Sequence, residues 1–460
     1  MSEHYHMVGV AGVGMSALAQ ALLARGCRVS GSDRFLDQGR PTDTLEVLRA
    51  AGVELTPQDG SGVRADTAGV IVSTAIEPDN PDLEAARAKG RPVLHRAEML
   101  ARLVRGRRLL AVAGTSGKTT VTGLLGWLLD WCGRRPTVVN GGAVLNWKGP
   151  GALGNFRNGR DDLWVIEADE SDRSFLQFEP EWAIVTNISR DHFELRETED
   201  LFREFARRAR EGVVCGRGVA GRLRRGPGDA FPAMLFEEQL EPAADGFVRE
   251  GVHFRVPLPG RHNIENAWLA VLLARHLGVH AVPLRDALLA FRGIERRLER
   301  VGEAGGVAVV DDYAHNPAKI SAAWTTMAGG GGRVLGVWRP HGFGPLAAMM
   351  PELEAAWLRV MRPADRLFLL PVFYAGGTAR AAADSGDLAR RLQEGGRAAT
   401  AVASYEDLEQ ELRAAARPGD TILVMGARDP ELPRFARRMV EGLKTATPRD
   451  GGAAPGSGCG

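Results

Sequence analysis

The sequence predicts an α/β protein of about three domains, and three observations support this. The chain has 460 residues, and domains average roughly 150 residues. Short β-branched runs alternate with helix-like stretches, a pattern that predicts parallel sheets covered by helices. Hydrophobic residues make up 44% and charged residues 25% of the chain. This composition is ordinary for a globular protein and excludes a fibrous or wholly disordered chain.

The charge balance and the spacing of the cysteines indicate which classes of partner and which cellular location to expect. Lys and Arg total 58 against 57 Asp and Glu, which argues against general binding to nucleic acid or to a membrane surface. We expect neither a membrane helix, which needs about 18 apolar residues, nor a secretory signal. The cysteines form no CxxC pair, so neither a disulfide framework nor a structural zinc site is expected. A cytoplasmic location fits these features best.

The first block, residues 5–100, opens with a strand and a glycine-rich turn. Gly12, Gly14 and Ala17 match the loose dinucleotide fingerprint, and Asp33 follows the next strand, where a ribose-binding carboxylate would lie. Glycines let the backbone approach a pyrophosphate at the start of the following helix. The pattern fits NAD, a UDP-sugar or a tight turn without a ligand. The helix after the turn places one apolar stripe on a single face: Met15, Leu18, Ala19, Leu22 and Leu23.

The second block begins at Leu109 and contains a phosphate-binding loop. The strand LLAVA leads into GTSGKT, and an apolar helix follows. Gly114 and Gly117 permit a ring of backbone N–H donors around phosphate oxygens. Lys118 can reach the β- and γ-phosphates, and the Thr119 hydroxyl is placed for magnesium. The strict Walker pattern has a glycine where this chain has Val112, so the loop is a shortened variant.

Acidic residues follow two further strands of the second block. Glu167, Asp169, Glu170 and Asp172 come directly after LWVI, and the strand AIVTNIS precedes Asp191 and His192. Carboxylates at strand ends are suitable magnesium ligands, so we expect metal next to the phosphate loop. A solvated acidic loop is the alternative, and histidine is an unusual magnesium ligand.

The third block, about residues 296–446, repeats the strand–helix rhythm with VAVVDDY, RVLGVW, RLFLLPV and TILVMGA. It closes with the basic, helix-like segment FARRMVEGL. Residues 447–460 have almost no apolar content, so a disordered tail is expected.

Over about residues 5–440 the chain resembles the Mur ligase family, the ATP-dependent amide-forming enzymes of peptidoglycan precursor synthesis. The motifs that carry the resemblance include VGVAGVGMSALA, AVAGTSGKTT, EADESDRSFL, AIVTNISRDH, GRHNIENAWLA, RRLERVGE and DDYAHNP. EADESDRSFL is typical of the alanine-adding members more than of the relatives that attach recycled peptide.

The resemblance implies three domains and a reaction. A Rossmann-like domain over 1–107 would bind the UDP-sugar. A central P-loop ATPase-type domain with a mixed sheet over 108–295 would bind ATP and Mg²⁺, and a Rossmann-like domain over 296–446 would bring the amino acid. The implied reaction joins L-alanine to UDP-N-acetylmuramate through an acyl phosphate, releasing ADP and phosphate. The partners would be small molecules alone, and a monomer or a homodimer is expected.

The resemblance also assigns residues to roles. The catalytic set is Lys118, Arg297 and His341. The ATP set is Gly114, Thr115, Ser116, Gly117, Lys118, Thr119, Thr120, His262, Asn263, Asn266, Arg297, Asp312 and His315. The UDP-sugar set is Gly12, Gly14, Met15, Ser16, Ser32, Asp33, Ser73 and Thr74. The metal set is Thr119, Glu167 and His192.

The chain departs from the family pattern at several positions. Ser116 and Asn316 stand where the alanine-adding members usually have histidine. Those members carry a PHRxxR-like segment whose arginines lie near the amino acid. Here His341 remains, but both downstream arginines are absent. The candidates to replace them are Arg339, Arg380 and Arg428.

Three alternatives stay open from the sequence. One is a Mur ligase paralogue that uses a different amino acid or acyl acceptor. Another is a non-catalytic nucleotide-binding regulator that has lost the amino-acid site. The third is an NAD-dependent oxidoreductase built on the first glycine turn, which leaves the phosphate loop unexplained.

Overall fold

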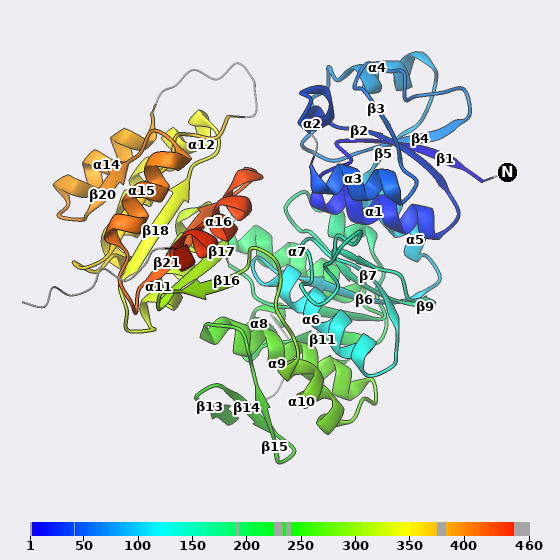
Figure 1. Ribbon diagram of the computed structural model, residues 1–460. Helices are drawn as coiled ribbons and strands as arrows, with labels where there is room; N and C mark the ends of the chain where they lie inside the picture. Colours follow the sequence, from blue (N-terminus) through cyan, green and yellow to red (C-terminus); the bar gives the residue numbers. More distant parts are fainter. Residues whose placement is uncertain are drawn as a thin grey trace, which may run out of the picture. The chain divides into compact units, whose positions relative to one another are not determined.

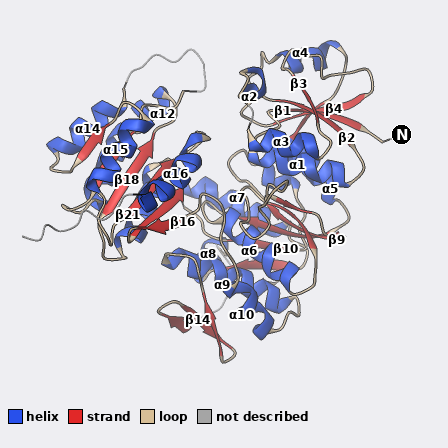
Figure 2. Ribbon diagram, viewed as in Figure 1, coloured by secondary structure: helices blue, strands red, loops and turns tan. Residues whose placement is uncertain are grey.

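The computed structural model describes residues 2–40, 42–189, 193–224, 233–235, 241–374 and 383–445 (Figure 1). The chain divides into two compact units, Met1–Ile294 and Glu295–Gly460, and each is described by itself. Strands and helices alternate along both units (Figure 2). The predicted α/β class is therefore confirmed. In the part of the chain that the structure describes, no helix is both long enough and apolar enough to cross a membrane.

The first unit begins with a five-stranded parallel sheet, drawn in blue in Figure 1, whose strand order is β3-β2-β1-β4-β5. This order is that of the first five strands of a Rossmann fold, so the predicted Rossmann-like character is confirmed. Its strands are β1 His4–Val8, β2 Arg28–Ser32, β3 Glu54–Thr56, β4 Thr67–Val72 and β5 Val93–His95. Its helices are α1 Val13–Ala24, α2 Arg34–Asp37, α3 Asp43–Ala50, α4 Pro81–Ala88 and α5 Arg96–Val104.

A second sheet of the first unit has seven strands in the order β12-β11-β10-β6-β9-β7-β8. All neighbours are parallel except β7 and β8, so the predicted mixed sheet is confirmed. The central strand β6 is apolar and buried beyond its first residue, as expected for a strand covered on both faces. The strands are β6 Arg108–Ala113, β7 Pro136–Val139, β8 Phe156–Arg157, β9 Arg160–Glu167, β10 Trp182–Val185, β11 Gly212–Cys215 and β12 Met234–Leu235.

Helices cover this second sheet, and a small antiparallel sheet packs against two of them, α9 and α10. The helix α6 follows β6 and packs against α9 and α10. The remaining helical segments are α7, α8 and a short 3₁₀ turn. The bounds are α6 Lys118–Trp131, 3₁₀ Ser174–Gln177, α7 Leu195–Arg207, α8 Arg217–Leu223, α9 Arg261–His276 and α10 Ala281–Leu289. The antiparallel strands are β13 Glu241–Ala243, β14 Gly246–Arg249 and β15 Val252–Arg255.

The two sheets of the first unit are linked through α1, which contacts β7 and β8. The side chain of Asn155 is buried and its amide nitrogen donates to the carbonyl of Val13 at 2.8 Å and to Ser16 Oγ at 2.9 Å. Gln20 Nε2 donates to the Asn155 amide oxygen at 3.1 Å. One asparagine therefore fixes the helix after the glycine turn against the phosphate-loop sheet.

The second unit contains a six-stranded sheet in the order β16-β17-β21-β18-β19-β20, and only β16 runs antiparallel to its neighbour. Alternate residues of its strands face two separate cores. One core includes residues of α11, α12, α13 and α14, and the other includes residues of α15 and α16. The strands are β16 Glu299–Ala304, β17 Val307–Asp312, β18 Val334–Arg339, β19 Arg366–Leu369, β20 Ala399–Ala401 and β21 Thr421–Gly426. The helices are α11 Pro317–Ala328, α12 Phe343–Ala348, α13 Met350–Val360, α14 Ser385–Glu394, α15 Tyr405–Ala415 and α16 Glu431–Thr445.

The link made by Asn155 predicts a stability effect. Asn155→Ala removes three hydrogen bonds at a buried position and should lower the free energy of unfolding by about 1–3 kcal/mol. Asn158→Ala is the matched control, because Asn158 lies three residues further along, just beyond β8, is exposed, and accepts one long hydrogen bond of 3.5 Å. Urea unfolding followed by circular dichroism measures both variants. Equal stabilities for the two would contradict the assigned role of Asn155.

Candidate functional site

The phosphate loop joins β6 to α6 through two glycines in the left-handed half of backbone space. Gly114 has φ 141° and Gly117, which immediately precedes α6, has φ 81°. A Cβ at Gly114 would lie 1.9 Å from Thr186 Oγ1, so a larger residue does not fit. The loop thus reaches the helix N-terminus in a conformation that leaves backbone N–H groups of the first turn without intrahelical partners. Such a turn is an anion-binding geometry.

Two residues at the end of β10 fix this loop. The Thr115 hydroxyl donates to Asn187 Oδ1 at 2.6 Å, and the Ser116 N–H donates to the same oxygen at 3.0 Å. Asn187 Nδ2 and Thr186 Oγ1 both donate to the Ser116 carbonyl, at 2.9 and 2.6 Å. The Ser116 side chain is exposed. Sequence reasoning missed Thr186 and Asn187, and the polar Thr-Asn pair at a strand end was the available signal.

Lys118 lies between the loop and a buried carboxylate. Its ammonium donates to the Gly114 carbonyl at 2.9 Å and to Glu170 Oε2 at 2.7 Å. Glu170 is 2% exposed, and burial raises its pKa despite the opposing charge of Lys118. Burial alone would lower the pKa of Lys118, but the charges of Glu170, Asp169 and Glu167 outweigh it and raise the pKa. The lysine is therefore charged and confined to one place.

The predicted metal ligands Thr119 and Glu167 lie next to each other. Thr119 Oγ1 donates to Glu167 Oε1 at 3.0 Å, and the second oxygen of Glu167 accepts from the Gly141 N–H at 2.8 Å. Glu170 Oε1 is buried without a hydrogen-bond partner. These hard oxygen donors fit Mg²⁺. The third predicted ligand, His192, lies outside the described residues. Within the described ranges, no group of three or more acidic, histidine or cysteine residues is arranged for a metal.

The first turns of α9 bring two predicted ATP residues to the phosphate loop. A Cβ at Gly117 would lie 2.7 Å from Asn266 Oδ1, so the Asn266 side chain directly contacts the phosphate loop. Asn266 Nδ2 donates to Asn263 Oδ1 at 3.2 Å, and Asn263 Nδ2 donates to the Pro259 carbonyl at 2.7 Å. His262 is exposed on the same turn. Thr120, also predicted at ATP, is buried in the first turn of α6.

A cavity of about 450 Å³ borders α9. The helix residues that line it, Arg261, Ile264 and Glu265, follow i, i+3 and i+4 spacing and therefore share one face of the helix. Asn263 and Asn266 share another face, which is the one that contacts the phosphate loop. The cavity and the loop contact thus lie on different sides of α9.

The predicted UDP-sugar turn is built around Asp33. One oxygen of its carboxylate accepts from the Phe35 N–H and the other from the Ala11 N–H, both at 3.0 Å. Burial raises the pKa of Asp33. The Asp33 carboxylate thus holds the backbone of the glycine turn in place at Ala11. Gly12 precedes α1, and a Cβ at Gly14 would lie 2.9 Å from the guanidinium of Arg96.

The other predicted sugar residues divide between buried and accessible positions. Met15 is buried in the core, and Ser16 bonds to Asn155 as described. Ser32 is buried and donates to Asp82 Oδ2 at 2.5 Å. These three side chains therefore contact protein. Ser73 is half-buried and Thr74 is exposed, both just beyond β4.

Arg96 and His95 connect this turn to the acidic loop after β9. Arg96 Nη2 lies 3.2 Å from Asp169 Oδ2, and His95 Nε2 lies 3.3 Å from Asp172 Oδ2. Burial lowers the pKa of His95 although Asp172 opposes the shift. Asp169 belongs to the same loop as Glu170, the partner of Lys118. The loop after β9 thus contacts both predicted binding regions of the first unit, the glycine turn before α1 and the phosphate loop.

Four predicted residues belong to the second unit. The Asp312 carboxylate accepts from the Leu298 and Ala314 N–H groups, both at 2.8 Å, and burial raises its pKa. The guanidinium of Arg297 lies 5.5 Å from the Tyr313 ring. His315 and His341 have ring centroids 5.4 Å apart. The structure therefore brings the two histidines together at the ends of β17 and β18.

Two departures from the family pattern have structural roles in the second unit. Asn316 is the N-cap of α11, because its side chain accepts from the Lys319 N–H at 2.9 Å. Arg339 pairs with Asp429, and its guanidinium lies 5.4 Å from the rings of both Phe373 and Tyr405. Arg380 lies outside the described residues.

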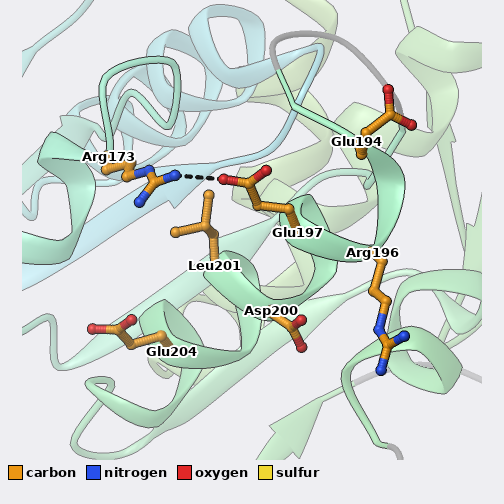
Figure 3. A pocket seen from close by; sticks show the side chains of 7 residues that line it. All are labelled: Arg173, Glu194, Arg196, Glu197, Asp200, Leu201 and Glu204. Atoms are coloured by element: carbon orange, nitrogen blue, oxygen red, sulfur yellow. Dashed lines mark hydrogen bonds and ion pairs between the residues drawn. The ribbon is translucent and has the colours of Figure 1, made fainter.

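A further cavity of about 420 Å³ lies beside α7 and is lined almost entirely by charged side chains (Figure 3). Arg173 and Glu197 form an ion pair across it. Among the residues that the structure describes, none of the predicted site residues lines this cavity. The described lining is Arg173, Glu194, Arg196, Glu197, Asp200, Leu201 and Glu204.

Comparison with known families matches three consecutive parts of the chain. "Mur ligase family, catalytic domain" matches residues 4–108, "Mur ligase middle domain" matches 112–206, and "Mur ligase, glutamate ligase domain" matches 296–428. The chain belongs to the Mur ligase family. The resemblance inferred from the motifs is thereby confirmed, and this Mur ligase is an enzyme, an ATP-dependent ligase.

Relatives of known name extend over nearly the whole chain. The UDP-N-acetylmuramate–L-alanine ligase of Cereibacter sphaeroides is 37% identical and covers 92% of this chain and 93% of its own length. The enzyme of the same name from Symbiobacterium thermophilum is 35% identical, with 98% of each chain covered. This Mur ligase is therefore similar along its length to alanine-adding members.

Solved structures share the fold. UDP-N-acetylmuramate–alanine ligase from Thermotoga maritima has a TM-score of 0.77 at 24% identity, covering 96% of this chain and all of its own. A murein peptide ligase from Psychrobacter arcticus has a TM-score of 0.67 at 21% identity, covering 97% of this chain and all of its own. Both the alanine ligase and the peptide ligase match, so structural likeness shows the fold of this Mur ligase and not its substrate.

The environment of His315 predicts a pH dependence. Burial lowers its pKa to about 4, below the value of 6.5 for an exposed histidine. Because the folded pKa is the lower one, the neutral ring stabilises the fold above about pH 6.5, and this contribution is lost as the pH falls toward about 4. An NMR titration should give a midpoint near 4 for the resonance that His315→Gln removes. A midpoint near 6.5 would show that the ring is accessible to water.

Proposed function

We propose that this Mur ligase joins L-alanine to UDP-N-acetylmuramate, consuming ATP and releasing ADP and phosphate. The observation that carries the proposal is the phosphate loop whose lysine and threonine each contact a carboxylate, Lys118 with Glu170 and Thr119 with Glu167. The names of the full-length relatives support the choice of substrates.

The chemistry requires activation, because a carboxylate does not react with an amine. In the proposed first step, a carboxylate oxygen of the sugar attacks the γ-phosphorus of ATP, and the bond from phosphorus to ADP breaks. The product is an acyl phosphate. The amine of alanine then attacks the acyl carbon and loses a proton, and the bond from carbon to phosphate breaks to leave the amide. Both steps move negative charge onto oxygens, so fixed positive charge stabilises their transition states.

Lys118 supplies such a charge in the first unit. Its position is set before ATP binds, since Glu170 and the Gly114 carbonyl both accept from its ammonium. The backbone N–H groups of the loop and of the first turn of α6 add further donors. No side chain is needed as a covalent nucleophile.

Thr119 and Glu167 are the residues that we propose as ligands of Mg²⁺, together with His192. The metal would add positive charge at the phosphate oxygens when bound. The buried, unpaired Glu170 Oε1 is a further oxygen donor beside this position.

The remaining expectations from the family resemblance are part of the proposal. The UDP-sugar would lie at the turn formed by Gly12 and Gly14. His341 would act at the amino acid, and Arg297, Asp312 and His315 would contact ATP, as the family resemblance implies. We propose domain limits of 1–107, 108–295 and 296–446, a cytoplasmic location, and either a monomer or a homodimer as the active form.

A paralogue that uses another amino acid is the second candidate, and the absence of both arginines after His341 favours it. Phosphate release from ATP with magnesium and UDP-N-acetylmuramate, measured across a panel of amino acids, separates the two. We expect release that depends on L-alanine. Release with a different amino acid alone would establish the paralogue, and ATP binding without release for any amino acid would indicate a regulator.

Lys118→Ala should reduce turnover at least a thousandfold, because it removes the fixed charge at the transferred phosphate. UDP-sugar binding, measured by calorimetry, should stay within about twofold, since Lys118 contacts the phosphate loop rather than the first glycine turn. Lys444→Ala is the control, because Lys444 is exposed at the end of α16.

Folding of this variant needs its own check, because Lys118→Ala leaves the buried Glu170 without its cation. The double variant Lys118→Ala/Glu170→Gln removes that charge as well and should be as inactive as the single variant, with a Tm closer to that of the wild type. Substantial turnover in either variant would mean that the phosphate loop is assigned wrongly.

A further inference from the structure

The carboxyl ends of β18 and β21 lie side by side, and the chain leaves them toward opposite faces of the sheet. Arg339 pairs with Gly426 in the parallel register, so both strands end at the same level. Beyond β18, α12 and α13 contribute to one core, and beyond β21, α16 contributes to the other. In open α/β sheets a crevice forms where successive connections diverge in this way, and ligands bind there.

Arg428, two residues beyond the end of β21, has an unusual backbone. Its φ of 65° is in the left-handed region, which a side chain such as arginine rarely adopts. The next residue, Asp429, is held firmly in place, since its carboxylate pairs with Arg339 and accepts from the Tyr405 hydroxyl at 2.6 Å and from the Glu431 N–H at 2.9 Å. Backbone strain of the kind found at Arg428 concentrates at functional sites.

The side chain of Arg428 is available to a ligand. It is exposed, and among the described residues it has no hydrogen bond or ion pair. Arg339, the other arginine at this edge, is committed to Asp429 and donates from Nε to the Pro371 carbonyl at 3.1 Å. The sequence left Arg339 and Arg428 as candidates to replace the absent arginines. The structure distinguishes them, because Arg339 is paired with Asp429 and Arg428 is exposed.

His341 lies two residues beyond the end of β18, just as Arg428 lies two residues beyond the end of β21, so the two residues leave adjacent strands at the same level. Burial lowers the pKa of His341, and the charge of Arg428 lowers it further. The ring of His315 packs against that of His341, with ring centroids 5.4 Å apart. Arg428 is therefore a positive charge on the loop next to the one that carries this histidine pair.

We propose that Arg428 binds the carboxylate of the incoming amino acid. This rests on the proposed function and deepens it, because it names the group that replaces the arginines absent after His341. A guanidinium matches a carboxylate with two parallel hydrogen bonds, and a single arginine matches the single negative charge of an amino-acid carboxylate. The phosphates of ATP have a separate set of donors at the Lys118 loop.

The test is steady-state kinetics of Arg428→Met against Arg366→Met. Arg366 is the matched control, because it is exposed at the amino end of β19, the opposite end of the same sheet. Arg428→Met should raise KM for L-alanine about ten- to hundredfold, as expected for a lost charge-assisted hydrogen bond. KM for ATP and for UDP-N-acetylmuramate should stay within about twofold, and Arg366→Met should match the wild type.

Three further measurements distinguish ligand binding from a structural role. The preference for L-alanine over L-alaninamide, as a ratio of kcat/KM, should fall in Arg428→Met, because only alanine has the carboxylate. Arg428→Gly should show the same rise in KM with an unchanged or higher Tm, since glycine adopts a φ of 65° without strain. Arg428→Lys should restore part of the affinity.

Several results would overturn the proposal. An unchanged KM for alanine in Arg428→Met, a rise in KM for ATP instead, or an effect found in Arg380→Met alone would each remove Arg428 from the amino-acid site. These results are distinct from failure of the proposed function, which would appear as a wild-type chain that releases no phosphate with alanine.

Discussion

The ion pair between Lys118 and Glu170 is the interaction on which the site in the first unit depends. Both groups are largely buried, and a buried charge is stable only when it is paired and hydrogen-bonded. The lysine is the first residue of α6, and the glutamate lies in the loop after β9. Their pairing therefore fixes the position of the phosphate loop relative to the acidic loop. It also places the cation where a triphosphate would meet the N-terminus of α6.

The same acidic loop also fixes the N-terminal sheet. Asp169 contacts Arg96, which packs on Gly14, while its neighbour Glu170 contacts Lys118. Adjacent residues of one loop thus connect the first glycine turn with the phosphate loop. Asn155 adds a second connection on the other side of α1. A reaction that transfers a phosphoryl group from one bound molecule to another requires this kind of fixed spacing, because misplacement of about 1 Å is costly.

The sequence was sufficient for the elements whose signal is local. The strand, two glycines and apolar helix around Lys118 predicted the phosphate loop because glycine and periodicity act over a few residues. The sequence also placed Thr119 and Glu167, the last residue of β9, in one metal set. The pairing of Glu170 with Lys118 was beyond its reach, because Glu170 lies in an irregular loop, which has no period from which side-chain directions follow. The contacts of Asn187 with a loop about 70 residues away, and of Ser32 with Asp82, depend on tertiary packing that spacing does not encode.

Two residues at which the chain departs from the family pattern have roles in the fold of the second unit. Asn316 caps α11, where a histidine side chain is a poorer acceptor for the first helical N–H groups. Arg339 stabilises the buried carboxylate of Asp429. Asp429 directly follows Arg428, whose backbone is left-handed and whose exposed side chain lies on the loop next to that of His341. In the proposed amino-acid site, Arg428 on the β21 loop would supply the positive charge that the family pattern places on the β18 loop.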